Sequence, residues 1–167
     1  MKRRVLKFGG SSVADFTKIK NIAEMLKRRV DDGEQLIVVV SAMGKTTDQL
    51  MENVSHLTTT PKDEELALLL TTGEQQTVSY LSMVLNDIGV SARAMTGYQA
   101  GIKTVGHHLK SRIAEINPET FNKEFKDKDV LVVAGFQGVN DELELTTLGR
   151  GGSDTTAVAL AASNQTP

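Results

Sequence analysis

The sequence contains no cysteine and no tryptophan, and only 4% of its residues are aromatic. The lack of cysteine excludes disulfide bonds and thiolate chemistry and fits a reducing compartment, so we expect a cytoplasmic protein. The 19 basic and 21 acidic residues nearly cancel. Because the basic residues are not gathered into one patch and aromatic side chains are few, we expect no nucleic acid as a partner.

Long apolar runs are also missing. No segment approaches the length of a membrane span, so we expect no contact with a membrane. After the basic start, only Val5 and Leu6 precede Lys7, which is too short an apolar core for a signal peptide. The 167 residues are enough for one domain with one hydrophobic core.

Short β-branched runs alternate with helical patterns along the chain. Strands are expected at 5–8, 36–40 and 130–134, with weaker strand patterns at 91–96, 112–116 and 141–147. One helix is expected after the first glycine loop, with apolar residues on one face from Ile19 to Val30. Further helices are expected at about 45–57, 60–70, 74–87 and 155–162, with a short one after Asn117. Thr60 and Pro61 form a plausible helix start, and Gly73 is expected to interrupt the helical stretch. This alternation predicts an α/β fold with a mostly parallel sheet.

Four glycine-bearing loops follow strands or precede a helix in this pattern, at 9–12, 41–44, 135–138 and 149–154. Ligands of parallel α/β sheets bind beyond the carboxyl ends of the strands. One such loop alone is most simply an ordinary turn, whereas four together favour a binding edge.

The last of these loops carries the most specific signal. Arg150 stands among three glycines, and Ser153 and Asp154 lead into an apolar helical run. Ser153 and Asp154 are good N-cap residues, a helix N-terminus favours an anion, and a guanidinium group fits a carboxylate or a phosphate. The segment therefore predicts an anion-binding loop.

Lys7 interrupts the first short apolar strand. It is either an edge lysine that reaches water or a charge that meets phosphate oxygens while the amides of Gly9 and Gly10 surround them. The residues alone leave both interpretations open.

Other polar residues have structural explanations of their own. Thr47 could cap the helix after Gly44, and Glu74 could stabilise the first turn of a helix. Phe136 could belong to the core or to a pocket wall. His107 and His108 are adjacent rather than four residues apart, so we expect no metal site built from protein ligands.

Six segments resemble, in the same order, the motifs of the aspartate kinases. They are 7–13 (KFGGSSV), 41–48 (SAMGKTTD), 71–74 (TTGE), 99–104 (QAGIKT), 135–138 (GFQG) and 147–156 (TLGRGGSDTT). The resemblance implies the amino-acid kinase fold, an αβα sandwich with a mostly parallel central sheet. It also implies Mg²⁺-assisted transfer of a phosphoryl group from ATP to the β-carboxylate of L-aspartate, giving 4-phospho-L-aspartate and ADP, the first step toward lysine, threonine and methionine.

Motif positions carry the family's site residues onto this chain. The resemblance implies catalytic roles for Lys7 and Asp154, an ATP phosphate site at Lys7, Gly9, Gly10 and Ser11, and an aspartate site at Ser41, Thr47, Glu74, Arg150 and Ser153. These residue types suit the reaction, because the attacking carboxylate is already ionised near pH 7 and needs no general base. Arg150 could bind the α-carboxylate of the substrate, and Glu74 could accept from its ammonium group.

The chain also departs from the family pattern. Family members continue with a T-D-V-D-G segment of the nucleotide site and with regulatory ACT domains. We therefore expect residues 1–167 to be the N-terminal portion of one catalytic domain, inactive alone, and the full-length protein to be a homo-oligomer. Val105 and Gly106 replace the usual aspartate after Thr104. Two alternatives are a non-catalytic aspartate-binding scaffold and a kinase of the same superfamily with another carboxylate or phosphate acceptor.

Overall fold

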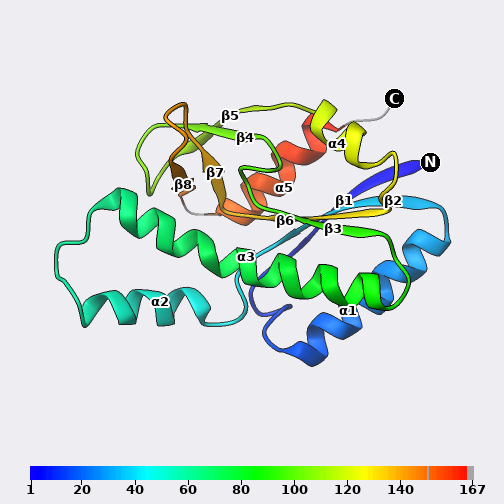
Figure 1. The fold of residues 1–167 in the computed structure, drawn as a ribbon, viewed down its shortest axis with the longest axis horizontal. Coiled ribbons are helices and arrows are strands. Elements are labelled where there is room, and N and C mark those ends of the chain that lie inside the picture. The colour runs from blue at the N-terminus through cyan, green and yellow to red at the C-terminus, as the bar shows by residue number, and fades with distance from the viewer. Residues whose placement is uncertain (150, 165–167) are drawn as a thin grey trace.

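The computed structural model describes residues 1–149 and 151–164, in which helices and strands alternate along the chain (Figure 1). The strands are β1 (Lys2–Phe8), β2 (Glu34–Val40), β3 (Ala92–Met95), β4 (Ile102–Val105), β5 (Arg112–Ile116), β6 (Val130–Ala134), β7 (Gln137–Val139) and β8 (Leu145–Thr147). The helices are α1 (Phe16–Asp31), α2 (Thr46–Ser55), α3 (Asp63–Asp87), α4 (Glu119–Glu124) and α5 (Gly152–Ser163). No helix in these described ranges is both long and apolar enough to cross a membrane.

The main sheet has four parallel strands in the order β1-β2-β6-β3. Its central strands β2 and β6 carry the continuous β-branched runs, and all five residues of β6 are buried. A strand with helices on both faces has no polar face, which is why these runs do not alternate. The expected strands at 36–40 and 130–134 are confirmed.

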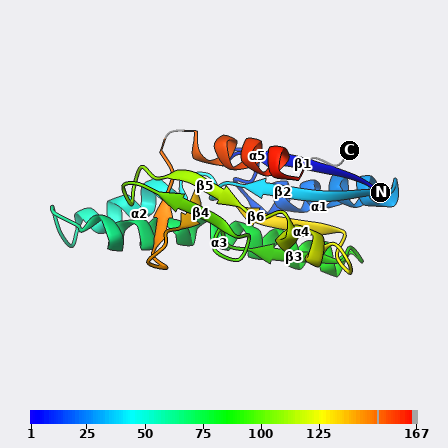
Figure 2. The same cartoon turned by 90° about the horizontal axis from the view of Figure 1, so that it is seen from above.

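Helices cover both faces of this sheet, as Figures 1 and 2 show. On one face, α1 and α3 pack against alternate strand residues such as Val38 and Val132. On the other, Phe121 of α4 and Leu160 of α5 pack against residues such as Val39 and Val133. Since successive strand residues point to opposite faces, each central strand contributes to two cores. The αβα sandwich implied by the resemblance is confirmed.

A second, smaller sheet has the order β5-β4-β7-β8. Strand β8 lies within 141–147, where a hairpin arm or an edge strand was expected, and it pairs with β7 in a hairpin. Strands β4 and β7 were not predicted. Both strands are short, and β7 pairs with β4 through Lys103 and Val139. A Cβ at Gly138 would lie 2.5 Å from Thr104 Cγ2, so this close approach of the two strands requires glycine.

The long helix α3 corrects the prediction of a break at Gly73. It runs without interruption from Asp63 to Asp87, and Lys62, in an extended conformation, is its N-cap. Thr60 and Pro61 therefore lie before the helix. A Cβ at Gly73 would lie 2.9 Å from the Cβ of Ala42, so tertiary packing explains the glycine. Packing of this kind outweighs the small intrinsic preference of glycine against helices.

Candidate active site

A cavity of about 590 Å³ opens where the loops after β1, β2 and β6 meet the starts of α2 and α5. The sequence-predicted residues that line it are Lys7, Gly10, Ser41, Thr47, Glu74, Ser153 and Asp154. Gly9 and Ser11 flank Gly10 in the same loop and are not among the described lining residues. Arg150 lies outside the described residues. The structure thus gathers residues from both ends of the chain in one place.

Lys7 and Asp154 form an ion pair across this cavity. The Nζ atom of Lys7, one residue before the end of β1, lies 2.9 Å from Oδ1 of Asp154 in the first turn of α5. The Asp154 side chain is 70% exposed, so the pair faces solvent or a ligand rather than the core. The strand lysine therefore has an anionic partner at the cavity.

The first two loops pack together without intervening side chains. The Gly44 N–H donates to the Gly10 carbonyl at 3.0 Å, and the Ser41 N–H donates to the Phe8 carbonyl at 3.1 Å. A Cβ at Gly10 would lie 3.0 Å from the Ala42 carbonyl oxygen. Glycine at position 10 thus allows the two loops to approach each other and leaves their backbone close to a ligand.

The second loop also contacts the start of α5. The hydroxyl groups of Ser41 and Ser153 are hydrogen-bonded at 2.8 Å. A Cβ at Gly135 would lie 2.9 Å from Ser153 Oγ, so the end of β6 approaches the same point. Three loops far apart in sequence converge here on one pair of hydroxyl groups.

The start of α5 differs from the predicted capping. Gly151 is the N-cap with φ of 72°, and Ser153 and Asp154 lie within the first turn without capping hydrogen bonds from their side chains. A side-chain cap needs an extended N-cap residue, whereas the left-handed conformation here favours glycine. The four residues of this first turn that line the cavity are Gly151, Gly152, Ser153 and Asp154, at the end of a helix where backbone N–H groups lack intrahelical partners.

Phe136 forms a wall of the cavity in a conformation that is rare for its residue type. Its φ is 70°, a left-handed value that costs roughly 1–2 kcal/mol for a non-glycine residue. Its N–H donates to Thr156 Oγ1 at 3.2 Å, and its carbonyl accepts from the Leu148 N–H at 2.8 Å. A Cβ at Gly152 would lie 2.3 Å from Phe136 Cδ2, so helix and ring fix each other's position.

Glu74 lies in the middle of α3, so the expectation of a first-turn glutamate is wrong. Its residue surface is only 3% exposed, although the side chain lines the cavity. Burial raises the pKa of Glu74 to about 8, and the hydrogen bond from Gln137 opposes part of that rise. The carboxyl group is therefore protonated at neutral pH until a cation approaches it.

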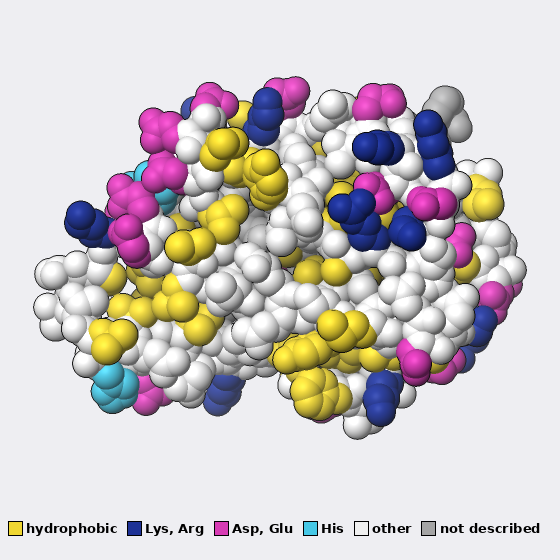
Figure 3. Space-filling model, in the orientation of Figure 1, with side chains coloured by type: hydrophobic (Ala, Val, Ile, Leu, Met, Phe, Trp, Pro, Cys, Tyr) yellow, Lys and Arg dark blue, Asp and Glu magenta, His cyan; other side chains and the backbone are white. Residues whose placement is uncertain are grey.

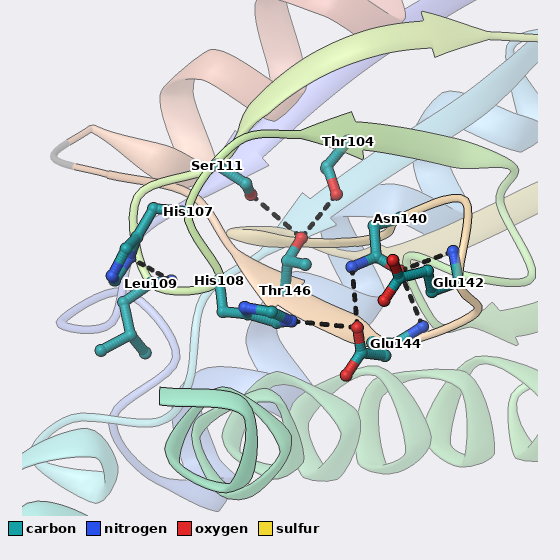
Figure 4. Close-up of polar contacts among 9 residues, drawn as sticks. All are labelled: Thr104, His107, His108, Leu109, Ser111, Asn140, Glu142, Glu144 and Thr146. Carbon is teal, nitrogen blue, oxygen red and sulfur yellow. Dashed lines mark hydrogen bonds and ion pairs between the residues drawn. The ribbon is translucent and has the colours of Figure 1, made fainter. Parts of the chain in front are cut away.

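Leu109 and Lys110 line the cavity and were not expected there. They belong to the β4–β5 loop, which is held by His107 Nε2 on Asp63 Oδ2 at 2.8 Å and by His108 Nε2 on Glu144 Oε1 at 3.2 Å. Figure 4 shows the second of these contacts. No local pattern marked Lys110, because its place depends on contacts with α3 and β8. In the described chain, no group of three or more His, Asp or Glu side chains could hold a metal ion.

The fold and this cavity define an αβα sandwich protein with a polar, glycine-lined site at the carboxyl edge of its parallel sheet. The amino acid kinase family model matches residues 2–165, and the chain belongs to this family.

Among curated relatives, the chain is 49% identical to an aspartokinase of Bacillus sp. (strain MGA3) and 48% identical to aspartokinase 2 of Bacillus subtilis (strain 168), each over 158 residues. These matches include 95% of this chain but 38% and 39% of the two relatives, so the chain spans less than half of their length.

Two solved structures are also similar. An aspartate kinase from Synechocystis has a TM-score of 0.79 at 44% identity, covering 97% of this chain and 26% of that one. E. coli aspartokinase III in complex with aspartate and ADP has a TM-score of 0.75 at 21% identity, covering 98% and 47%, and that likeness concerns the fold alone.

Proposed function

We propose that the protein containing this chain is an aspartate kinase, which transfers the terminal phosphoryl group of ATP to the β-carboxylate of L-aspartate. The observation that carries the proposal is the single cavity that joins the Lys7–Asp154 pair to Ser41, Thr47, Glu74 and Ser153. The identity to aspartokinases supports the choice of substrate within the family. Because the chain spans 38% of such a relative, the proposal concerns the whole protein.

The nucleotide phosphates belong, in this proposal, at the β1 end of the cavity. Lys7 supplies a cation, and the loop at Gly9, Gly10 and Ser11 supplies backbone groups without bulky side chains. Mg²⁺ would be bound mainly by the phosphates and water, as is common for this ion. Among the residues at this end of the cavity, Asp154 has the exposed carboxylate that could supply a further ligand to Mg²⁺, although this carboxylate already pairs with Lys7.

Aspartate belongs on the opposite side, against α2, α3 and α5. Ser41, Thr47 and Ser153 offer hydroxyl groups, and Glu74 offers a buried carboxylate for the ammonium group. Arg150 is assigned to a substrate carboxylate from its motif position. A buried acid without a cation is costly to ionise, so pairing with an ammonium group would select an amino acid over a simple dicarboxylate.

Little acid–base chemistry is required of these residues. The acceptor carboxylate is ionised at neutral pH, so the site must bring two anions together and stabilise charge on the transferring phosphoryl group. Lys7 and the backbone amides suit this work. Asp154 acts by orienting Lys7 rather than as a base.

The wider setting follows from the same resemblance. We propose that residues 1–167 are the N-terminal portion of one catalytic domain in a cytoplasmic homo-oligomer, acting in the first step toward lysine, threonine and methionine.

The proposal is tested with ATP, Mg²⁺ and aspartate, trapping the acyl phosphate as a hydroxamate in the full-length protein. Lys7→Ala should lower kcat by roughly 10²–10³, the loss typical of one missing preorganised donor. Lys27→Ala is the matched control, because Lys27 pairs with Asp31 on α1 far from the cavity. Trapping that does not depend on aspartate, or that prefers glutamate, would refute the proposal.

A further inference from the structure

Gln137 carries a buried side-chain amide next to the cavity, and both its nitrogen and its oxygen are hydrogen-bonded. It is 1% exposed and lies at the start of β7. Its Nε2 atom donates to the Thr71 carbonyl at 2.9 Å and to Glu74 Oε2 at 3.2 Å, and its Oε1 atom accepts from the Gly97 N–H at 3.2 Å. Both ends of the amide are therefore engaged, which fixes its orientation.

Two glycines next to Gln137 allow β7 to lie close to its neighbouring segments. A Cβ at Gly97 would lie 2.5 Å from the Gln137 carbonyl oxygen, and a Cβ at Gly138 would lie 2.5 Å from Thr104 Cγ2. Glycine at both positions lets β7 pack deeply between β4 and the loop after β3. Movement of the amide away from Glu74 would also break its hydrogen bonds with the Thr71 carbonyl and the Gly97 N–H.

We infer that Gln137 is a positioning residue for the acceptor site: its amide holds the Glu74 carboxylate by Oε2, so that Oε1 receives the ammonium group of the amino-acid substrate. The identity of that ammonium group rests on the proposed function, whereas the contact between the two side chains does not. The hydrogen bond donated by Gln137 favours the ionised form of Glu74.

Other charges near Glu74 are few in the described part of the chain. Lys7, Lys110 and Asp154 line the same cavity, and the first and last are paired with each other. Burial opposes ionisation of Glu74, and no cation among the described residues is bonded to it. Besides a backbone hydrogen bond, the donor from Gln137 is the side-chain contact that supports the charged form before substrate binds.

The test follows the titration of Glu74 directly. In the full-length protein labelled with ¹³C at the glutamate carboxyl carbon, the Glu74 signal is assigned by its loss in Glu74→Gln. The Gln137→Met variant should move the Glu74 midpoint upward by about one to two pH units, the effect of losing one hydrogen bond to a charged group. Aspartate affinity at pH 7 should fall about tenfold or more. In a plot of aspartate affinity against pH, the acid limb, where affinity falls as Glu74 is protonated, should move to higher pH with the Glu74 midpoint.

The matched control is Thr146→Val. Thr146 is equally buried in the same small sheet, where its hydroxyl contacts Thr104 at 2.6 Å and accepts from Ser111 at 3.0 Å (Figure 4). It is not among the described residues that line the cavity. Its loss should lower stability and leave the Glu74 midpoint and the acid limb unchanged.

An unchanged Glu74 midpoint in Gln137→Met would overturn the inference, because Gln137 would then serve only to stabilise the fold. If that variant does not fold, Gln137→Asn replaces it, since it keeps a neutral amide in the core and its side chain, one methylene shorter, withdraws the donor from Glu74; the same upward shift is expected. A shifted midpoint in a protein that binds no aspartate would refute the proposed substrate and still support the control of Glu74 by Gln137.

Discussion

At the scale of single residues, the site depends on where charge is buried. Glu74 combines a long polar side chain with almost complete burial, while Lys7 and Asp154 remain accessible as a pair. The motifs predicted that these three residues belong to the site. They did not predict that Glu74 is buried, because neither its helix position nor the sequence spacing indicates burial. The consequence for Glu74 can be measured as a dependence of stability on pH.

Between its unfolded pKa near 4.5 and its folded pKa of about 8, Glu74 binds more protons in the folded state than in the unfolded state. Its contribution to stability is therefore lost as pH rises through this window. Glu74→Gln should remove this slope, so its free energy of unfolding should fall less than that of the wild type between pH 5 and pH 8.5. Denaturant unfolding at both pH values measures this.

The control for that measurement is Glu24→Gln, which changes an exposed glutamate on α1. It should retain the wild-type dependence on pH. Equal slopes in Glu74→Gln and the wild type would show that Glu74 is not buried as described.

At the scale of elements, close backbone contacts place the helices around the cavity. Gly73 on α3 faces Ala42 of the second loop, and Gly152 on α5 faces Phe136. The sequence suggested that Gly73 ends a helix and that Ser153 or Asp154 caps one. Both expectations used local preferences, and both are wrong because the contacts come from distant segments.

Gly73→Ala tests this packing. Alanine favours a helix by about 0.5–1 kcal/mol over glycine, but overpacking at such a contact costs about 1–3 kcal/mol. A Cβ only 2.9 Å from that of Ala42 makes the second effect larger. We expect a net loss of about 1 kcal/mol in chemical denaturation.

The double variant Gly73→Ala with Ala42→Gly restores the space and should recover that stability. A Gly73→Ala protein more stable than the wild type would contradict the tight contact between α3 and the second loop.

At the scale of the whole molecule, strand pairing and burial are most complete at the central strands β2 and β6. β2 and β6 are each paired on both sides and covered on both faces. Helix α2, by contrast, has no buried residue in any of its ten described positions. The hydrophobic side chains that Figure 3 shows over α2 and the start of α3 remain at the surface, and Leu57 just after α2 is 85% exposed.

Hydrogen exchange should reflect this difference. Amides of β2 and β6 should exchange last, near the rate set by global unfolding, while those of α2 should exchange early through local opening. Exchange followed by mass spectrometry or NMR compares the two segments within one sample. Equal protection of α2 and β6 would mean that α2 is held by contacts beyond those in this structure.

The sequence by itself determined the α/β alternation, the main parallel strands and the family resemblance, because each appears as a local pattern or a contiguous motif. It also indicated that several glycine loops share one edge, since parallel strands end on the same side of a sheet. The resemblance implied catalytic roles for both Lys7 and Asp154, and the tertiary structure shows the ion pair between them. Only the tertiary structure decided that Glu74 is buried under Gln137 and that Lys110 reaches the cavity. These contacts join segments up to nearly the whole chain apart, and local preference carries no information about such distances.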